Sequence, residues 1–194
     1  MFDLKEHPHR RFNTLTREWL IVSPHRTKRP WQGQIENANR SVAPNYDADC
    51  YLCPSNNRVG DEVNPDYKDV FVFENDFAAL QSDIPQGSSN ENDLLIAQSE
   101  RGICRVLCFS PNHGLTLSQM KTADIKQVVD EWTKQYVDLG NVEFINYVQI
   151  FENRGEMMGS SNPHPHGQIW ASENVPNESQ KELVSQSTYF EKNK

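Results

Sequence analysis

The segment from Glu152 to Gln168 gathers the residues of this chain that are best suited to chemistry on an anionic ligand. It contains a turn rich in Gly, Ser and Asn, two histidines separated by one proline, and a glutamine that opens an apolar run. A turn of this composition can present backbone N–H groups to an anion. We therefore interpret the segment as an anion-binding loop that leads into a strand.

His164 and His166 are the candidate reactive groups of this segment. Side chains two residues apart point the same way in extended backbone, and Pro165 fixes φ between them. A neutral imidazole that carries its hydrogen on one nitrogen has a free electron pair on the other, which can attack phosphorus. Two surface histidines of a loop are the alternative interpretation.

The four cysteines fall into two pairs with different surroundings. Cys50 and Cys53 form a Cys-x-x-Cys motif in a polar segment rich in Pro, Asn and Asp, which favours a metal-binding turn. A redox pair is the alternative, but the strand-then-helix pattern of thioredoxin-like proteins is missing. Cys104 and Cys108 lie in an apolar, β-branched run, so we expect them to be small core residues of a strand.

The net charge of −8 argues against nonspecific binding to nucleic acid or to an anionic membrane surface. Residues 1–40 nevertheless hold 8 Lys and Arg against 4 Asp and Glu, which suits one local anionic ligand, although ordinary scatter of surface charge would give the same balance. No apolar run approaches the ~20 residues that span a bilayer, and the N-terminus is too charged for a signal peptide. We expect a cytoplasmic protein.

Hydrophobic periodicity indicates the elements that must position these groups. One amphipathic helix is predicted over 122–139, with Thr122 as its cap and Gly140 as its end, and a more polar helix over about 177–190. Residues 82–92 are predicted to be a surface loop. The short connections predict an α+β fold, a mainly antiparallel sheet with helices on one face. Strands are predicted at 19–22, 70–73, 94–97, 103–109, 144–151 and 168–171.

The string from Ser161 to Gln168, Ser-Asn-Pro-His-Pro-His-Gly-Gln, resembles the active-site signature of the galactose-1-phosphate uridylyltransferase family, a branch of the histidine-triad superfamily. Blocks at 7–11, 23–33, 50–54, 73–77 and 109–113 agree with that family in order and spacing. The resemblance implies transfer of UMP from UDP-glucose to a hexose 1-phosphate, galactose 1-phosphate, through a covalent uridylyl-histidine.

The resemblance also implies a role for individual residues. His166 matches the nucleophile, Gln168 the residue that binds the uridylyl phosphoryl oxygens, and Ser161 a phosphate contact. The positions that match substrate-binding residues are Arg26 and Arg29 near the phosphates, Asn75, Asp76 and Phe77 on the nucleoside side, and Asn153 and Gly159 in the phosphate pocket.

Two metal sites belong to the same resemblance. Cys50, Cys53, His113 and His164 match the ligands of a structural Zn²⁺. Glu182 matches one ligand of an iron-type site, Fe²⁺ in a full-length chain, whose histidines come from a second half of the family's chain that is missing from this sequence.

The family's enzymes have two related halves and act as homodimers, and this chain resembles the first half. We expect 1–176 to be a histidine-triad-like catalytic domain, and 177–194 a helical segment that leads to the missing half. Two alternatives stay open: a related nucleotide phosphorylase or hydrolase of the superfamily, and an inactive zinc-stabilised nucleotide-binding fragment.

Overall fold

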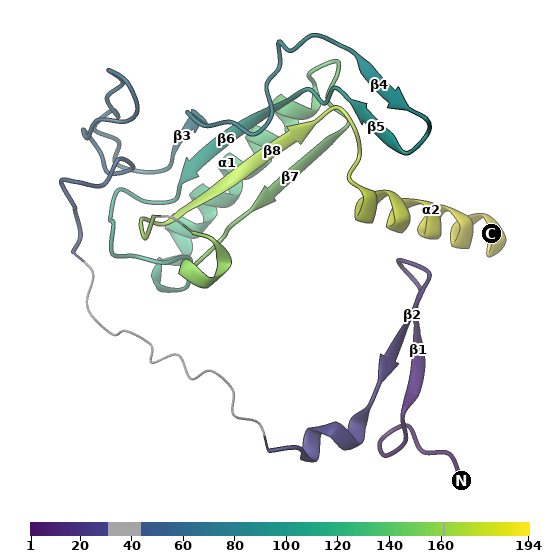
Figure 1. The fold of residues 1–194 in the computed structure, drawn as a ribbon. Coiled ribbons are helices and arrows are strands. Elements are labelled where there is room, and N and C mark those ends of the chain that lie inside the picture. The colour runs from purple at the N-terminus through teal and green to yellow at the C-terminus, as the bar shows by residue number, and fades with distance from the viewer. Residues whose placement is uncertain (31–43, 161) are drawn as a thin grey trace. The chain divides into compact units, whose positions relative to one another are not determined.

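The computed structural model describes residues 1–30, 44–160 and 162–194 (Figure 1). Contacts group the chain into two compact units. One consists of Met1–Arg40 together with Val175–Lys194, and the other of Ser41–Asn174. Ser161, which the sequence assigns to a phosphate contact, lies outside the described residues.

The Ser41–Asn174 unit is built on a four-stranded antiparallel sheet with the strand order β3-β6-β8-β7. Its inner strands are β6 (Gly102–Cys108) and β8 (His166–Ser172), and its outer strands are β3 (Phe71–Glu74) and β7 (Tyr147–Phe151). The four strands confirm the predictions for this part of the chain, with β7 beginning later than expected. The register places Cys108 opposite His166 and Val106 opposite Gln168.

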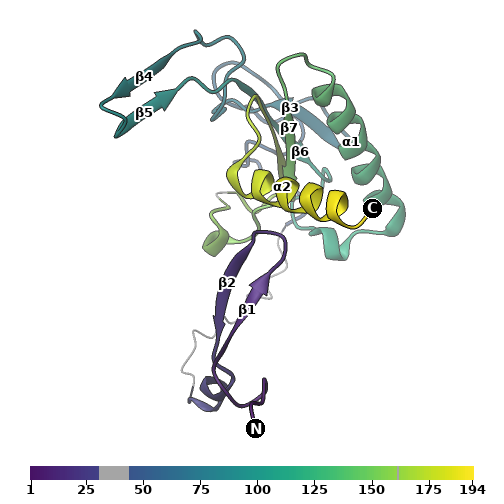
Figure 2. The same cartoon turned by 90° about the vertical axis from the view of Figure 1, so that its right-hand side faces the viewer.

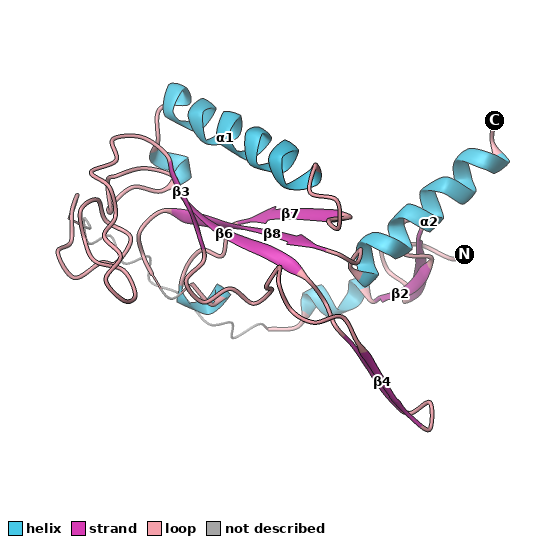
Figure 3. Ribbon diagram, turned by 90° about the horizontal axis from the view of Figure 1, so that it is seen from above, coloured by secondary structure: helices cyan, strands magenta, loops and turns pink. Residues whose placement is uncertain are grey.

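Helix α1 (Thr122–Gly140) packs on one face of this sheet, as Figure 3 shows. The helix was expected, but the role of Thr122 as its cap was wrong. Lys121 occupies the capping position, without a side-chain hydrogen bond, and Thr122 is the first helical residue. Two short 3-10 turns, η2 (Leu117–Gln119) and η3 (Glu156–Met158), complete this unit.

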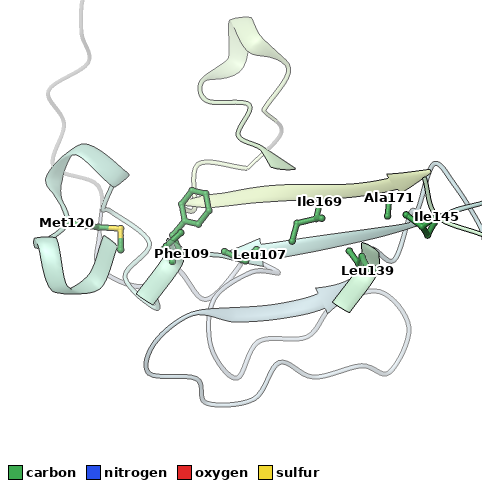
Figure 4. Packing of buried hydrophobic residues seen from close by; sticks show 8 residues of the cluster. Leu107, Phe109, Met120, Leu139, Ile145, Ile169 and Ala171 are labelled. Atoms are coloured by element: carbon green, nitrogen blue, oxygen red, sulfur yellow. The ribbon is translucent and has the colours of Figure 1, made fainter. Parts of the chain in front are cut away.

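Strand β6 is buried on both faces and separates two apolar clusters. Leu107 belongs to the cluster under α1, which includes Phe109, Ile169 and Leu139 (Figure 4). On the opposite face, Val106 and Cys108 pack with the Cys-x-x-Cys segment. Since side chains alternate along a strand, the residues of β8 that face away from α1 are His166, Gln168 and Trp170. Cys104 and Cys108 are fully buried, as predicted.

The prediction of a surface loop over 82–92 was wrong at its C-terminal end. Residues Ser88–Glu91 form β4, which pairs with β5 (Leu95–Gln98) in a hairpin that extends away from the sheet (Figures 1 and 2). Asn92 and Asp93 form its turn with positive φ angles of 55° and 58°, as the tightest hairpin turns require. Strand β4 could not be recognised from its polar sequence, because all four of its residues are exposed and burial therefore requires no apolar residue among them.

The other unit contains a two-stranded hairpin and a helix. The strands are β1 (His9–Asn13) and the predicted β2 (Glu18–Val22), followed by a 3-10 turn, η1 (Pro24–Lys28). Helix α2 (Asn177–Lys192) was also expected, and its Lys181 forms an ion pair with Glu18. Because α2 belongs to this unit, α1 is the helix that covers the sheet among the described residues. Neither α1 nor α2 is long and apolar enough to cross a membrane.

Candidate active site and metal centre

Two cysteines and two histidines that are distant in sequence meet in one buried cluster. Their possible ligand atoms, from Cys50, Cys53, His113 and His164, all lie within 4.8 Å of one another. The Nδ1 atoms of both histidines are 3.5 Å from the Sγ of Cys53. The structure therefore brings together the four residues that the sequence assigns to zinc, in a set that could hold a metal ion.

Local hydrogen bonds shape the cysteine turn of this cluster. The N–H of Cys53 donates to the carbonyl of Cys50 at 3.1 Å, which closes the turn. The N–H of Leu52 and the side-chain amide of Asn162 both donate to the Sγ of Cys50 at 3.4 Å. These contacts fix the position of the Cys50 sulfur within the cluster.

The titration of the cluster suits a bound cation. Burial raises the pKa of the Cys53 thiol to about 11 and lowers the pKa of His164 to about 4. A neutral imidazole is the form that binds a metal, whereas a buried thiolate needs a positive charge nearby. Two thiolates and two imidazoles are a closed tetrahedral donor set, and they fit a structural rather than a catalytic metal.

Residues outside the cluster hold His164 in place. Its Nε2 lies 2.9 Å from the carbonyl oxygen of Ser110 and 3.1 Å from the hydroxyl of Tyr67, which donates to the carbonyl of Leu52 at 2.5 Å. The hydrogen therefore resides on Nε2, and Nδ1 is free for the metal. Burial raises the pKa of Tyr67 far above its usual value. The sequence analysis missed Tyr67, because an isolated tyrosine carries no spacing signal.

His166 is held by the backbone of the residue two positions before it. It begins β8, and its Nδ1–H donates to the carbonyl oxygen of His164 at 2.7 Å. The prediction of extended backbone was wrong at His164, which lies in a bend where its N–H donates to Oδ1 of Asn162. The imidazole of His164 thus enters the metal cluster, and the Nε2 of His166 keeps a free electron pair.

Two cavities, each of about 400 Å³, meet at His166. The first, which we call the loop cavity, is lined by 152–155, 160, 162–166 and two residues before η2. The second, the strand cavity, is lined by the cysteine turn and three neighbouring strands; its residues are Tyr51, Leu52, Val59, Phe73, Asn75, Asp76, Phe77, Val106, His166 and Gln168. A ligand that filled both cavities would contact His166.

The side chain of Gln168 has one end of its amide occupied. Its Oε1 accepts a hydrogen bond from the indole N–H of Trp170 at 3.1 Å. The amide NH₂ group is therefore the end that is left to bind a ligand in the strand cavity. Its two N–H donors can form hydrogen bonds to an anionic oxygen.

The predicted substrate residues divide between the two cavities and the rest of the chain. Asn75, Asp76 and Phe77 line the strand cavity, and Asn153 lines the loop cavity. Gly159 has a φ of 78°, is exposed, and is absent from the described lining of both.

Three predicted residues belong to the other unit of the chain. Arg26 and Arg29 lie in and after η1, where both are exposed. Glu182 lies on α2, and among the described residues it joins no group of possible metal ligands.

The fold is shared with a class of proteins that includes GalT-like proteins of known structure. Over 97% of this chain and 56% of the other, the structure is similar to an ADP-glucose phosphorylase from Arabidopsis thaliana with bound ADP-glucose, with a TM-score of 0.67 and 26% identity. A GalT-like protein of the same plant has a TM-score of 0.64 and 25% identity, over 97% of this chain and 54% of that one.

The sequence places the chain within this class. It belongs to the galactose-1-phosphate uridyltransferase family, whose N-terminal domain matches residues 1–176. Galactose-1-phosphate uridylyltransferases of Haemophilus influenzae and Saccharomyces cerevisiae are 49% and 50% identical to it, over 98% and 97% of this chain. The chain spans 54% and 55% of these two relatives, about half of their length.

Proposed function

We propose that this chain is the nucleotide-binding and nucleophilic half of a transferase that moves UMP from UDP-glucose to galactose 1-phosphate. The observation that carries the proposal is the position of His166, whose Nδ1 is anchored to a carbonyl and which lines both cavities. The two relatives that are 49% and 50% identical to the chain over the matched region support the same activity.

The proposed reaction has two symmetrical steps. The Nε2 of His166 attacks the α-phosphorus of UDP-glucose, an N–P bond forms, and the P–O bond to glucose 1-phosphate breaks. The imidazolium that results is stabilised because its Nδ1–H already donates to the carbonyl oxygen of His164. A phosphate oxygen of galactose 1-phosphate then attacks the same phosphorus, which releases UDP-galactose and restores the neutral imidazole.

The remaining site residues bind and orient in this scheme. The Gln168 amide donates to the phosphoryl oxygens, which gain charge as the phosphorus is attacked. Asp76 accepts hydrogen bonds from ribose hydroxyls, and Phe77 forms an apolar wall for the base. We assign the loop cavity, with Asn153, to the sugar phosphate. The phosphate-binding roles of Gly159, Ser161, Arg26 and Arg29 are proposed from the family resemblance alone.

We infer that the Cys₂His₂ cluster holds Zn²⁺, supported by its donor set and burial. When bound, the ion would tie the cysteine turn to the loop that carries His166. Cys50, Cys53, His113 and His164 are the residues that would hold it. We also propose a cytoplasmic homodimer, with the Fe²⁺-type site of Glu182 completed only by a second half of the chain.

The test is the mass of the intact protein after incubation with UDP-glucose. We expect an increase equal to one uridylyl group, lost in His166→Ala and kept in His25→Ala, a substitution at an exposed histidine of η1. An unmodified wild-type chain, both alone and joined to the second half that the relatives possess, would contradict the proposal.

A second candidate function rests on the likeness to the ADP-glucose phosphorylase. The same histidine would then accept AMP from ADP-glucose and pass it to inorganic phosphate. Competition separates the two: UDP-glucose should displace a bound uridine nucleotide, and ADP-glucose should not. Binding of both sugar nucleotides without any adduct would instead support an inactive nucleotide-binding fragment.

A further inference from the structure

The side chain of Arg58 contacts Asp76, a residue that lines the strand cavity, and the sequence alone does not predict this contact. Its Nε lies 3.2 Å from Oδ2 of Asp76, and its guanidinium carbon lies 4.1 Å from the ring centre of Phe73. The arginine side chain is 11% exposed and the aspartate side chain 20%. The charged pair is therefore largely removed from water, directly behind a wall of the cavity.

The contact leaves one oxygen of Asp76 available. Oδ2 faces Arg58, whereas Oδ1 has no hydrogen-bond or ion-pair partner among the residues that the structure describes. The buried Nε–H of Arg58 also lacks an aligned acceptor within the same residues. A small turn of the carboxylate would align it with Nε, and an aligned charged hydrogen bond is favourable in a buried site.

The charge of Arg58 matters for the ligand as well as for the carboxylate. An unpaired carboxylate on the cavity wall would repel an anionic nucleotide. Paired with Arg58, Asp76 can accept hydrogen bonds from hydroxyl groups while the local charge stays near zero. Glu62 is the other acid near Arg58, but at 4.0 Å and 71% exposed it is a weak partner.

Arg58 is also connected to the metal cluster. Its Nη1 lies 3.5 Å from Oδ1 of Asn64, a fully buried side chain. The amide NH₂ of Asn64 donates to the carbonyls of Tyr51 at 2.8 Å and Cys53 at 2.9 Å. The cysteine turn, Asn64, Arg58 and Asp76 therefore form one continuous series of polar contacts from the cluster to the strand cavity.

We propose that Arg58 is a positioning residue of the nucleoside site, which fixes the carboxylate of Asp76 so that its free oxygen accepts a ribose hydroxyl. The inference rests on the proposed function, because it takes the strand cavity as the site of the nucleoside. It predicts that Arg58 governs the recognition of ribose and has no direct contact with the ligand.

The experiment measures binding of UDP and of its 2′-deoxy and 3′-deoxy analogues to the metal-loaded chain by calorimetry. We expect Arg58→Met to weaken UDP binding about tenfold. We also expect the variant to bind UDP and the deoxy analogue that the wild type binds more weakly with nearly equal affinity. Arg58 and Asp76 act as one unit, so the double variant with Asp76→Asn should bind no more weakly than Asp76→Asn alone.

Arg101 offers a matched control within the same unit of the chain. It also pairs with a carboxylate, Glu173 at 2.8 Å, and stacks 4.4 Å from the ring centre of Phe144, but it lines neither cavity. Arg101→Met should lower thermal stability and leave UDP binding within about twofold of the wild type. If Arg58→Met does not fold, Arg58→Lys keeps the charge over Phe73 but lacks the planar fork, and it should still reduce the preference for ribose.

The outcomes separate this inference from the function on which it rests. A wild-type chain that binds no uridine nucleotide would overturn the proposed function, and the role of Arg58 with it. Wild-type binding that persists unchanged in folded Arg58 variants would overturn the role of Arg58 alone. Equal weakening of UDP and both deoxy analogues, additive with Asp76→Asn, would likewise show that Arg58 acts only on stability or net charge.

Discussion

The carbonyl oxygen of His164 accepts the hydrogen bond from Nδ1 of His166 at 2.7 Å, while the imidazole of His164 lies 3.5 Å from the Sγ of Cys53. One residue thus uses its side chain in the metal cluster and its backbone to fix the tautomer of the candidate nucleophile. Any change that moves His164 is transmitted directly to His166. The Cys₂His₂ cluster and the candidate nucleophile are in this sense one structural unit.

Cys53→Ser should therefore impair both stability and reactivity. A structural zinc ion contributes on the order of 10 kcal/mol to the folding of small metal domains, so loss of one thiolate should lower the melting temperature by more than about 10 °C. The rate of uridylyl-adduct formation should fall with it. Calorimetric melting, metal content and intact mass would measure the three effects.

Cys104→Ser is the matched substitution, because Cys104 is equally buried in the same unit but lies outside the cluster. It should keep the metal and lose only the stability that a buried hydroxyl costs, about 1–3 kcal/mol. Equal metal content in the two variants would contradict the assignment of Cys53 as a ligand.

Only the cysteine half of the ligand set could be predicted from the residues themselves. Cys50 and Cys53 interrupt a polar segment in a spacing that favours a metal-binding turn, whereas His113 and His164 were assigned through the family resemblance. The strands of the sheet were also predictable. Strand β6 is buried on both faces and is apolar throughout most of its length, whereas buried residues alternate with less buried ones along β8. Burial on one face or on both faces of a strand requires apolar residues at fixed intervals, and these intervals are visible in the sequence.

The supporting residues could not be predicted, because they depend on tertiary contacts between distant segments. Tyr67 acquires its role only when it meets His164, and Arg58 only when it meets Asp76. Strand β4 was missed for the opposite reason: its exposed residues face no core and carry no apolar alternation. The bend at His164 depends on the side chain of Asn162, which no periodicity indicates.

Trp170→Phe should slow adduct formation without a large loss of stability. The substitution removes the indole N–H that holds Oε1 of Gln168 at 3.1 Å, so the amide is free to turn its oxygen toward an anionic ligand. We expect a decrease of about tenfold in the rate, the effect of one misplaced charge-stabilising donor. Rapid-quench mass spectrometry with UDP-glucose would measure it.

Trp132→Phe provides the comparison, because the indole N–H of Trp132 is buried and has no partner among the described residues. Trp132 belongs to α1 and forms a T-shaped ring contact with Phe109. Both residues lie on the face of the sheet away from Gln168. Its substitution should leave the rate unchanged. Equal rates for the two variants would show that Trp170 does not orient Gln168.

The ion pair between Arg101 and Glu173 should make a pH-dependent contribution to stability. Hydrogen bonds from the Arg101 guanidinium lower the pKa of Glu173 from 4.5 to about 2. The contribution is therefore complete above pH 4.5 and is lost as the pH falls toward about 2, where the carboxylate is protonated in the folded state. Urea unfolding should show Glu173→Gln less stable than the wild type at neutral pH, with a difference that narrows below pH 4.5. A difference independent of pH would contradict this.

Gly167→Ala should disturb the reactive histidine through the backbone. A Cβ atom at this position would lie 2.9 Å from both the ring of Phe109 and the carbonyl oxygen of Phe151, so β8 must shift next to His166 and Gln168.

Gly102→Ala creates a comparable clash, with Leu80 and the carbonyl of Ala171, at the end of β6 that pairs with the far end of β8. Both variants should lose about 1–3 kcal/mol of stability, the usual result of overpacking. Only Gly167→Ala should also slow adduct formation, by about tenfold or more, because a displacement near 1 Å suffices to misalign a nucleophile. Equal rates in the two variants at matched folded fractions would show that the position of His166 does not depend on this close approach.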